Sequence, residues 1–309
     1  MTVGPGDVRA AVERIAGHVR RTPVLELGEI DGASVVAKLE LLQHTGSFKP
    51  RGAFNKLLSS EVPSAGVIAA SGGNFGLAVA HAAREIGHRA EIFIPSTSPE
   101  AKVAKVRAQG ATVNVVEGYY AEAQAALGAR HGETGALLMH PFDQPEVIAG
   151  QGTIGIELDE QIPDLDTVLV AIGGGGLIAG IAAWFERRVR VIGVEPARCA
   201  TMTAALAAGE PVVGEVGGVA VDSLGSARVG DHVFPIVRDQ VDRVVLVEDD
   251  AIREAQRGLW EDVHVIAEPG GAAAFAALRS GAYHPEPGER VCVLVSGGNC
   301  DPSSVTGSP

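Results

Sequence analysis

The residue best suited to covalent chemistry in this sequence is Lys49, which lies in the segment HTGSFKPRGA, residues 44–53. An apolar run expected to be a strand precedes it, and a phenylalanine and a proline flank it. Burial disfavours a charged amine and lowers its pKa from the usual value of about 10.4, and we expect the nearby charge of Arg51 to lower it further. A neutral amine is a nucleophile, so this segment indicates Lys49 as a catalytic residue.

The other lysines have simpler interpretations. Lys102 and Lys105 are three residues apart on an expected helix, which predicts a solvent-exposed face. Lys38 lies in the apolar run VVAKLEL, where alternation would direct its side chain to the solvent face of a strand. Lys56 lies in the expected helix RGAFNKLL. We therefore expect Lys38 and Lys56 at the surface as well.

A glycine run separates the apolar run TVLVAI from the expected helix LIAGIAAWFERR. It consists of Gly173, Gly174, Gly175 and Gly176. Residues without a Cβ let several backbone N–H groups point at one anion, and a helix N-terminus adds positive potential. The run therefore predicts a phosphate site.

The same run leaves a dinucleotide site open as an alternative. Gly174, Gly176 and Ala179 fit the pattern G-x-G-x-x-A. Glu195 ends the next apolar run, about 20 residues on, where a dinucleotide enzyme would hold a ribose.

Two further loops read SGGN, and each follows an apolar run. The first consists of Ser71, Gly72, Gly73 and Asn74. Its glycines and the helix that follows could bind a carboxylate, although taken alone it is more simply a turn with Asn74 as helix N-cap. The second loop places the hydroxyl of Ser296 at the end of a strand.

Short β-branched runs alternate with alanine-rich helical stretches along the chain. The expected strands are SVVAKLEL, GVIAAS, AEIFIP, ATVNVVE, TVLVAI, RVIGVEP and RVCVLVS. This alternation predicts an α/β fold with parallel strands covered by helices on both faces. Ligands of such folds bind at the carboxyl ends of the strands, which is where all three glycine-rich loops stand.

Composition excludes several classes of function. The chain has 309 residues, 46% of them hydrophobic, which is enough for two compact lobes. Its net charge is −13 and no basic cluster stands out, so nucleic acid is not an expected partner. Cys199, Cys292 and Cys300 show no C-x-x-C spacing, and the N-terminus lacks the pattern of a signal peptide. We therefore expect a cytoplasmic protein.

The segment from Thr167 to Phe185 carries no charge and is nearly long enough to span a membrane. Four glycines at its centre would weaken a helix by about 1 kcal/mol each, so a strand, a loop and a helix fit better. No membrane contact is expected.

The order of these motifs resembles the serine/threonine dehydratases (threonine ammonia-lyases), which are fold-type II enzymes dependent on pyridoxal 5′-phosphate (PLP). The resemblance runs through HTGSFKPRGA, SGGN, HPFDQPEVIAGQGTIGIEL, VAIGGGGLIAGIA, GVEP, EPGGAAAFAAL and SGGNCD, nearly the whole chain. It implies two open, twisted, mostly parallel sheets covered by helices, and a homodimer. It also implies a large PLP-binding domain of residues 1–58 and 144–309 and a small substrate-binding domain of residues 62–142.

By the same resemblance, Lys49 carries PLP covalently and Phe48 lies against its ring. The glycine run 173–176 would hold the phosphate, and Asn74 the phenolic oxygen. Ser296 would face the pyridine nitrogen, with Glu268 near it.

The substrate would be a small amino acid such as L-threonine or L-serine, whose carboxylate Ser71, Gly72, Gly73 and Asn74 would bind. The expected products are 2-oxobutyrate or pyruvate, with ammonia. Serine racemases use a serine where this chain has Gly72, so we expect little racemisation.

The chain departs from the family pattern at two places. Phe75 replaces a histidine or alanine, and the acidic pair that binds a divalent cation in some members is not reproduced around Glu215 to Asp222. We therefore expect no metal. The alternatives are a β-replacement enzyme of the cysteine-synthase type, an NAD-dependent Rossmann dehydrogenase, and a non-catalytic relative.

Overall fold

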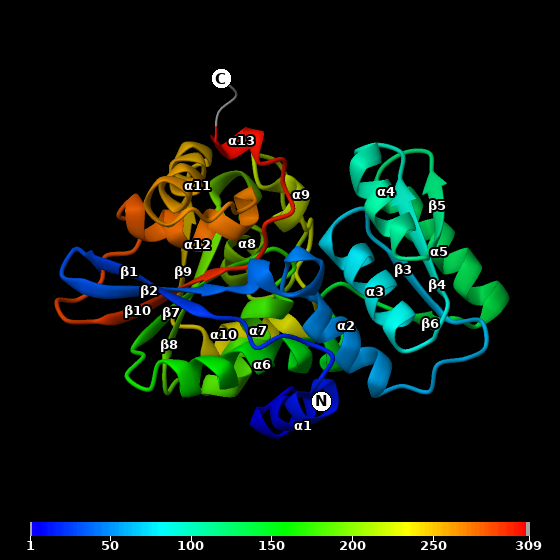
Figure 1. Ribbon diagram of the computed structural model, residues 1–309, viewed down its shortest axis with the longest axis horizontal. Coiled ribbons are helices and arrows are strands. Elements are labelled where there is room, and N and C mark those ends of the chain that lie inside the picture. The colour runs from blue at the N-terminus through cyan, green and yellow to red at the C-terminus, as the bar shows by residue number, and fades with distance from the viewer. Residues whose placement is uncertain (1, 307–309) are drawn as a thin grey trace.

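The computed structural model describes residues 2–306, which form two open sheets (Figure 1). The six-stranded sheet has the order β1 (Val24–Ile30), β2 (Ala33–Leu39), β10 (Arg290–Val295), β7 (Thr167–Ala171), β8 (Arg190–Pro196) and β9 (Arg243–Val247). The four-stranded sheet has the order β5 (Thr112–Val116), β4 (Ala90–Pro95), β3 (Val67–Ala70) and β6 (Leu137–Leu138). Only the β1–β2 pair is antiparallel among these strands, so the predicted α/β fold with mostly parallel sheets is confirmed.

The central strands are apolar because helices cover both of their faces. Every residue of β3 and β7 is buried, which is why these strands lack polar alternation. The sequence interpretation missed β1, β6 and β9, which lie at sheet edges and are partly exposed. Edge strands mix polar and apolar residues, so their pattern is weaker.

Helices cover the sheets in layers (Figure 1). The six-stranded sheet has α11 (Asp249–Val263) and α12 (Pro269–Arg279) on one face and α1 (Pro5–Ile15), α6 (Pro145–Gln161), α7 (Gly176–Phe185) and α10 (Val233–Gln240) on the other. The four-stranded sheet has α3 (Asn74–Glu85) and α4 (Glu100–Ala108) on one face and α5 (Tyr120–Thr134) on the other. The remaining helices are α2 (Lys49–Leu58), α8 (Thr201–Ala208), α9 (Val221–Leu224) and α13 (Ser303–Thr306).

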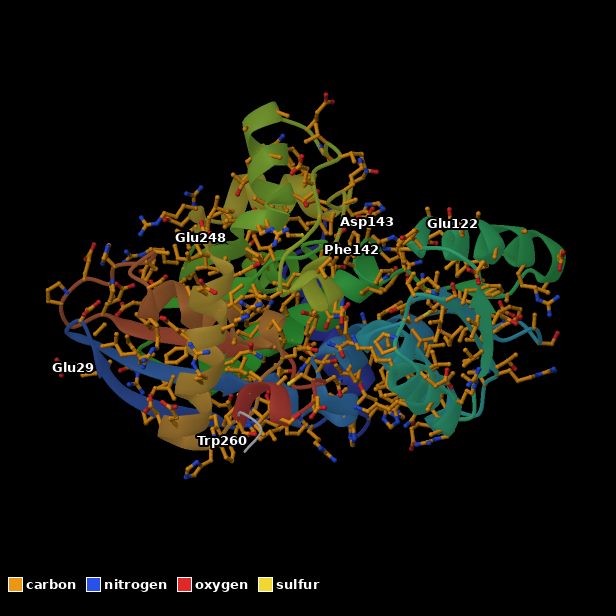
Figure 2. All side chains as sticks on the ribbon, turned by 90° about the horizontal axis from the view of Figure 1, so that it is seen from above. Glu29, Glu122, Phe142, Asp143, Glu248 and Trp260 are labelled. Atoms are coloured by element: carbon orange, nitrogen blue, oxygen red, sulfur yellow. The ribbon has the colours of Figure 1, made fainter. Side chains whose placement is uncertain are left out.

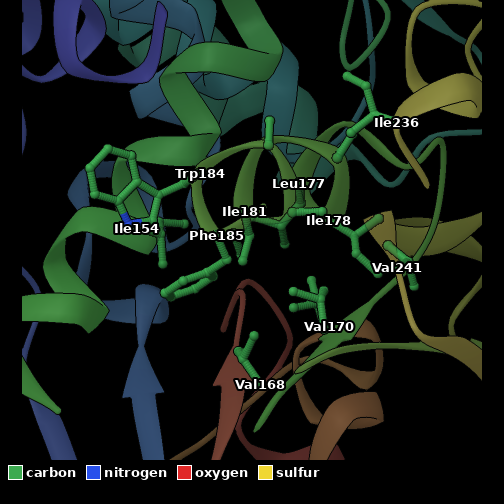
Figure 3. Packing of buried hydrophobic residues seen from close by; sticks show 14 of the residues in the cluster. Ile154, Val168, Val170, Leu177, Ile178, Ile181, Trp184, Phe185, Ile236 and Val241 are labelled. Atoms are coloured by element: carbon green, nitrogen blue, oxygen red, sulfur yellow. The ribbon is translucent and has the colours of Figure 1, made fainter. Parts of the chain in front are cut away.

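The helix after the glycine run is held by apolar packing. Figure 3 shows Ile178, Ile181 and Phe185 of α7 above Val168 and Val170 of β7, and all five side chains are fully buried. This packing fixes the start of α7 at the carboxyl end of β7. Within residues 2–306, no helix combines the length and the apolar character needed to cross a bilayer.

The expected surface position of Lys38 is wrong. Lys38 is fully buried, and its Nζ donates hydrogen bonds to the carbonyl oxygen of Thr22 (2.7 Å), Oε1 of Gln161 (2.7 Å) and Oε2 of Glu157 (2.5 Å). A buried charge needs such partners, and they come from segments far away in the sequence. Lys56 is half-buried and pairs with Glu146 at 3.2 Å, so it is not a freely exposed residue either.

The expected effect of Arg51 on Lys49 is also wrong. Arg51 is 1% exposed and donates to both carboxylate oxygens of Glu40, at 2.8 and 2.7 Å, and to Glu157 at 2.7 Å. Two carboxylates thus neutralise its charge. Lys38, Glu40, Arg51 and Glu157 form what we call the buried charge cluster, which joins β2, α2 and α6.

Candidate active site

Lys49 is the first residue of α2, and its amine faces few polar groups. The backbone N–H of Phe48 donates to the carbonyl of Ser296 at 3.1 Å, which anchors this helix start to the loop after β10. The Lys49 amine donates to the carbonyl of Pro141 at 3.0 Å and lies 4.8 Å from the centre of the Phe48 ring and 5.8 Å from that of Phe75. Lys49 is partly buried, and desolvation of the amine lowers its pKa to about 8, although Glu268 acts in the opposite direction.

The glycine run 173–176 is required by its surroundings. Gly175 has φ of +90°, which favours glycine, and it caps the start of α7. A Cβ on Gly174 would overlap the ring of Phe142, and one on Gly176 would lie 2.7 Å from the Phe142 carbonyl oxygen. Gly173 is similarly close to Leu224. Close packing therefore requires glycine at these positions, and the loop stands at a helix N-terminus, whose N–H groups are suited to a phosphate.

The segment from His140 to Asp143 connects the glycine run to Lys49. Pro141 accepts the hydrogen bond of the Lys49 amine, and Phe142 packs on the glycines. Figure 2 shows Phe142 and Asp143 near the junction between the two halves of the molecule, each of which contains one sheet. The sequence interpretation assigned no role to this segment, because a main-chain carbonyl and a packing ring leave no chemical pattern.

The side chain of Asn74, in the half of the molecule with the four-stranded sheet, forms hydrogen bonds with residues of the other half. Its Nδ2 donates to Oε1 of Glu268 at 2.6 Å, and its Oδ1 accepts from Nδ2 of Asn299 at 2.8 Å. The simple interpretation of Asn74 as N-cap is wrong: Gly73 is the N-cap of α3, and Asn74 is its first residue. Its side chain is directed at other loops instead. Burial raises the pKa of Glu268, partly offset by the bond from Asn74.

The two serines among the predicted site residues, Ser296 and Ser71, contact main-chain groups. Ser296 is buried, and its Oγ lies 3.5 Å from the carbonyl oxygen of Gly270. Ser71 accepts a hydrogen bond from the N–H of Gly73 at 3.3 Å, which closes the turn. The first SGGN loop, residues 71–74, is followed directly by Phe75, whose ring centre lies 5.8 Å from the Lys49 amine. This loop and the lysine therefore belong to one site.

Glu195 does not lie where a ribose could reach it. It is fully buried and accepts hydrogen bonds from the N–H groups of Met202 (2.7 Å) and Thr203 (2.9 Å) and from the Thr203 hydroxyl (2.7 Å). These donors belong to the first turn of α8. The carboxylate thus serves the helix start, and the dinucleotide alternative loses its ribose-binding residue.

Acidic residues near the site are dispersed. Glu215 is exposed, and Asp222, also exposed, pairs with Lys102 at 2.9 Å. In the part of the chain that the structure describes, no three His, Cys, Asp or Glu side chains gather as metal ligands would.

Comparison with known proteins agrees with this geometry. Residues 15–297 match the family model described as pyridoxal-phosphate dependent enzyme. The L-threonine ammonia-lyase of Geobacter sulfurreducens is 40% identical over 307 residues, covering 97% of this chain and 76% of that protein. The serine racemase of Arabidopsis thaliana is 37% identical, covering 97% of this chain and 94% of that protein.

Solved structures show the same likeness. Maize serine racemase superposes with a TM-score of 0.93 at 34% identity, covering 97% of this chain and 95% of that one. The T.th. threonine deaminase gives a TM-score of 0.90 at 38% identity, covering 96% of this chain and 99% of that one. The chain therefore belongs to the pyridoxal-phosphate dependent enzyme family, has the fold of type II predicted from its sequence, and uses PLP as its cofactor.

Proposed function

We propose that this enzyme is a lyase that removes water and then ammonia from L-threonine or L-serine. Relatives named L-threonine ammonia-lyase are 40% and 38% identical to it over nearly its full length. The observation that carries the proposal is the Lys49 amine, which bonds the carbonyl of Pro141, next to the Phe142 that packs on the glycine run, and whose pKa is lowered to about 8. PLP supplies, when bound, an electron sink that makes the Cα proton of an amino acid acidic.

Several residues are positioned to hold the cofactor. We assign the covalent attachment to Lys49, the phosphate to the N–H groups of residues 173–176, and one face of the ring to Phe48. Asn74 would donate to the phenolic oxygen. Ser296, with Glu268 near it, would face the pyridine nitrogen.

Different residues of the chain would carry out the separate steps of the elimination. Lys49, neutral above pH of about 8, takes the proton from Cα. The electron pair left behind forms the Cα–Cβ double bond as the Cβ–O bond breaks, and the departing hydroxide takes up the proton that Lys49 removed and leaves as water. The released enamine hydrolyses to the keto acid and ammonia. Ser71, Gly72, Gly73 and Asn74 bind the substrate carboxylate at the N-terminus of α3.

Ser296 favours elimination over reactions that need a long-lived carbanion. A carboxylate at that place would keep the pyridine nitrogen protonated and the electron sink strong. A hydroxyl is neutral and cannot do this, so the weaker sink favours prompt loss of a β-leaving group.

We also propose the organisation of the chain. Residues 1–58 and 144–309 would form the PLP-binding domain, and residues 62–142 the substrate-binding domain, a division supported by the two separate sheets. The cytoplasm is the proposed location, supported by three cysteines that form no disulfide. A homodimer is the proposed assembly, on family resemblance.

The direct test measures products from L-threonine and L-serine with PLP-loaded enzyme. We expect keto acid and ammonia in equal amounts. Sulfide addition to O-acetylserine without keto acid from either substrate would place the enzyme among the β-replacement enzymes instead.

Serine racemase is the second candidate, because several relatives and solved structures carry that name. Gly72 argues against efficient racemisation, since inversion needs a second acid or base opposite Lys49 and glycine offers none. A Cβ at Gly72 would overlap Oγ of Ser98, so Gly72→Ser requires that this hydroxyl move away.

Chiral chromatography separates the two candidates. We expect little D-serine beside pyruvate from the wild type, and a measurable gain in Gly72→Ser combined with Ser98→Ala. The matched control is Gly72→Ala with Ser98→Ala, which has the same steric change and no hydroxyl. D-serine formation by the wild type at a rate rivalling pyruvate would contradict the lyase assignment.

A further inference from the structure

Asn299, three residues after Ser296, connects two loops that belong to different halves of the molecule. Its Nδ2 donates to the carbonyl oxygen of Thr45 at 2.7 Å and to Oδ1 of Asn74 at 2.8 Å. An amide nitrogen carries two hydrogens, so both bonds can form at once. Thr45 lies four residues before Lys49, and Asn74 begins α3, which covers the four-stranded sheet.

The Asn299 bond fixes the orientation of the Asn74 amide. With Oδ1 of Asn74 facing Asn299, its Nδ2 faces the Glu268 carboxylate at 2.6 Å. Turning the amide over would place oxygen against a carboxylate and NH₂ against NH₂, which is unfavourable at both ends. One hydrogen of Asn74 Nδ2 is thereby used by Glu268, and the other stays free for an acceptor in the site.

The other Asn299 bond holds a strained part of the lysine segment. Thr45 has φ of +62°, a conformation that costs energy for a residue other than glycine. The next residue, Gly46, has φ of +76°, and a Cβ there would lie 2.8 Å from Oδ1 of Asn299. The N–H of Gly298 also donates to the Gly46 carbonyl at 3.0 Å. The backbone leading to Lys49 is therefore fitted to the Asn299 side chain.

We propose that Asn299 is a positioning residue for PLP. It holds Asn74 with a donor N–H directed at the cofactor, and it couples that residue to the segment that carries Lys49. Asn299 itself need not touch the cofactor. The proposal rests on the proposed role of Asn74 toward the phenolic oxygen of PLP.

The test compares PLP dissociation constants by equilibrium dialysis. We expect Asn299→Ala to weaken PLP binding about five- to tenfold, the value of one hydrogen bond that positions another group. Asn299→Asp has nearly the same shape, but its carboxylate attracts Nδ2 of Asn74 away from the cofactor, so we expect a larger loss. Asn114→Ala is the matched control, because Asn114 on the edge strand β5 bonds Glu91 on the neighbouring strand β4 at 2.8 Å.

A double-mutant cycle distinguishes positioning from a merely structural role. If Asn299 acts through Asn74, adding Asn299→Ala to Asn74→Ala should weaken PLP binding much less than adding it to the wild type, the remaining loss being that of the bond to Thr45. Loss of the Asn74 donor should also shift the pH midpoint of the bound cofactor's near-visible absorbance upward, by a similar amount in both single variants. Additive losses, or an unchanged dissociation constant in Asn299→Ala and Asn299→Asp, would overturn the inference.

The design separates this inference from the proposed function. Wild-type enzyme that binds no PLP, or that after borohydride reduction carries the cofactor on a residue other than Lys49, would refute the assignment of the site itself. Normal wild-type binding with unaffected Asn299 variants would refute only the positioning role. Should Asn299→Ala fail to fold, the near-isosteric Asn299→Asp carries the same comparison.

Discussion

Two lysines that are close in the sequence, Lys38 and Lys49, have different surroundings: Lys38 is fully buried and Lys49 partly buried. Lys38 lies in β2, and its amine meets a carboxylate, an amide oxygen and a main-chain carbonyl. Lys49 starts α2, and its amine meets one carbonyl and two aromatic rings. Burial lowers the pKa of both amines, and Glu157 and Glu40 partly restore that of Lys38.

The difference shows that burial by itself does not make a lysine reactive. A buried ammonium that has a carboxylate partner can stay charged, and its ion pair holds together the elements that it joins. An amine that is desolvated and has no directly bonded anion has a lowered pKa, about 8 for Lys49, so a larger fraction of it is neutral and nucleophilic. In this chain the buried charge cluster joins structural elements, and Lys49 is the residue to which we assign the chemistry.

The largest effect is expected from Lys49→Ala. Removing the amine removes both the covalent attachment of PLP and the base, so keto-acid production should fall by more than about 1,000-fold. Borohydride reduction and peptide mapping should find the cofactor on Lys49 in the wild type. Cofactor found on Lys38 after reduction, or substantial activity in Lys49→Ala, would contradict the assignment of Lys49 as the reactive lysine.

Lys38→Met should affect stability rather than chemistry. It leaves part of the buried charge cluster unpaired, and we expect about 3 kcal/mol lower free energy of unfolding, measured by urea denaturation. Lys56→Met is the control, because Lys56 forms a half-exposed pair with Glu146 and should cost about 1 kcal/mol or less. Folded Lys38→Met protein should still take the label on Lys49, and loss of that label would show that Lys38 has a chemical role.

The smallest effect concerns pH. Because the Lys49 pKa is about 8 in the folded protein, the neutral, reactive fraction of the amine decreases as the pH falls below that value. The rate of PLP attachment to the cofactor-free enzyme should rise about tenfold per pH unit up to pH of about 8 and then level off. Stopped-flow absorbance would measure this rate, and Lys38→Met should keep the same profile. A rate still rising at pH of about 10 would mean that the amine is not desolvated.

Local patterns in the sequence determined the fold class, Lys49 as the reactive lysine candidate, and the glycine-rich loops. Strand and helix periodicity, a scarce residue type and residues without a Cβ are properties of short segments, so they can be recognised without knowing what lies opposite. The steric need for glycine at 174 and 176 comes from Phe142, which only the structure shows, but the glycines themselves are visible in the sequence.

Only the tertiary structure decided which polar groups meet across long separations. Lys38 reaches Glu157, 119 residues away, and Asn74 reaches Asn299, 225 residues away. Glu195 stood at the expected place in the sequence, but the first turn of α8 uses its carboxylate. A buried charge is stabilised by whichever partners the folded chain brings to it, and the sequence around the charge does not name those partners.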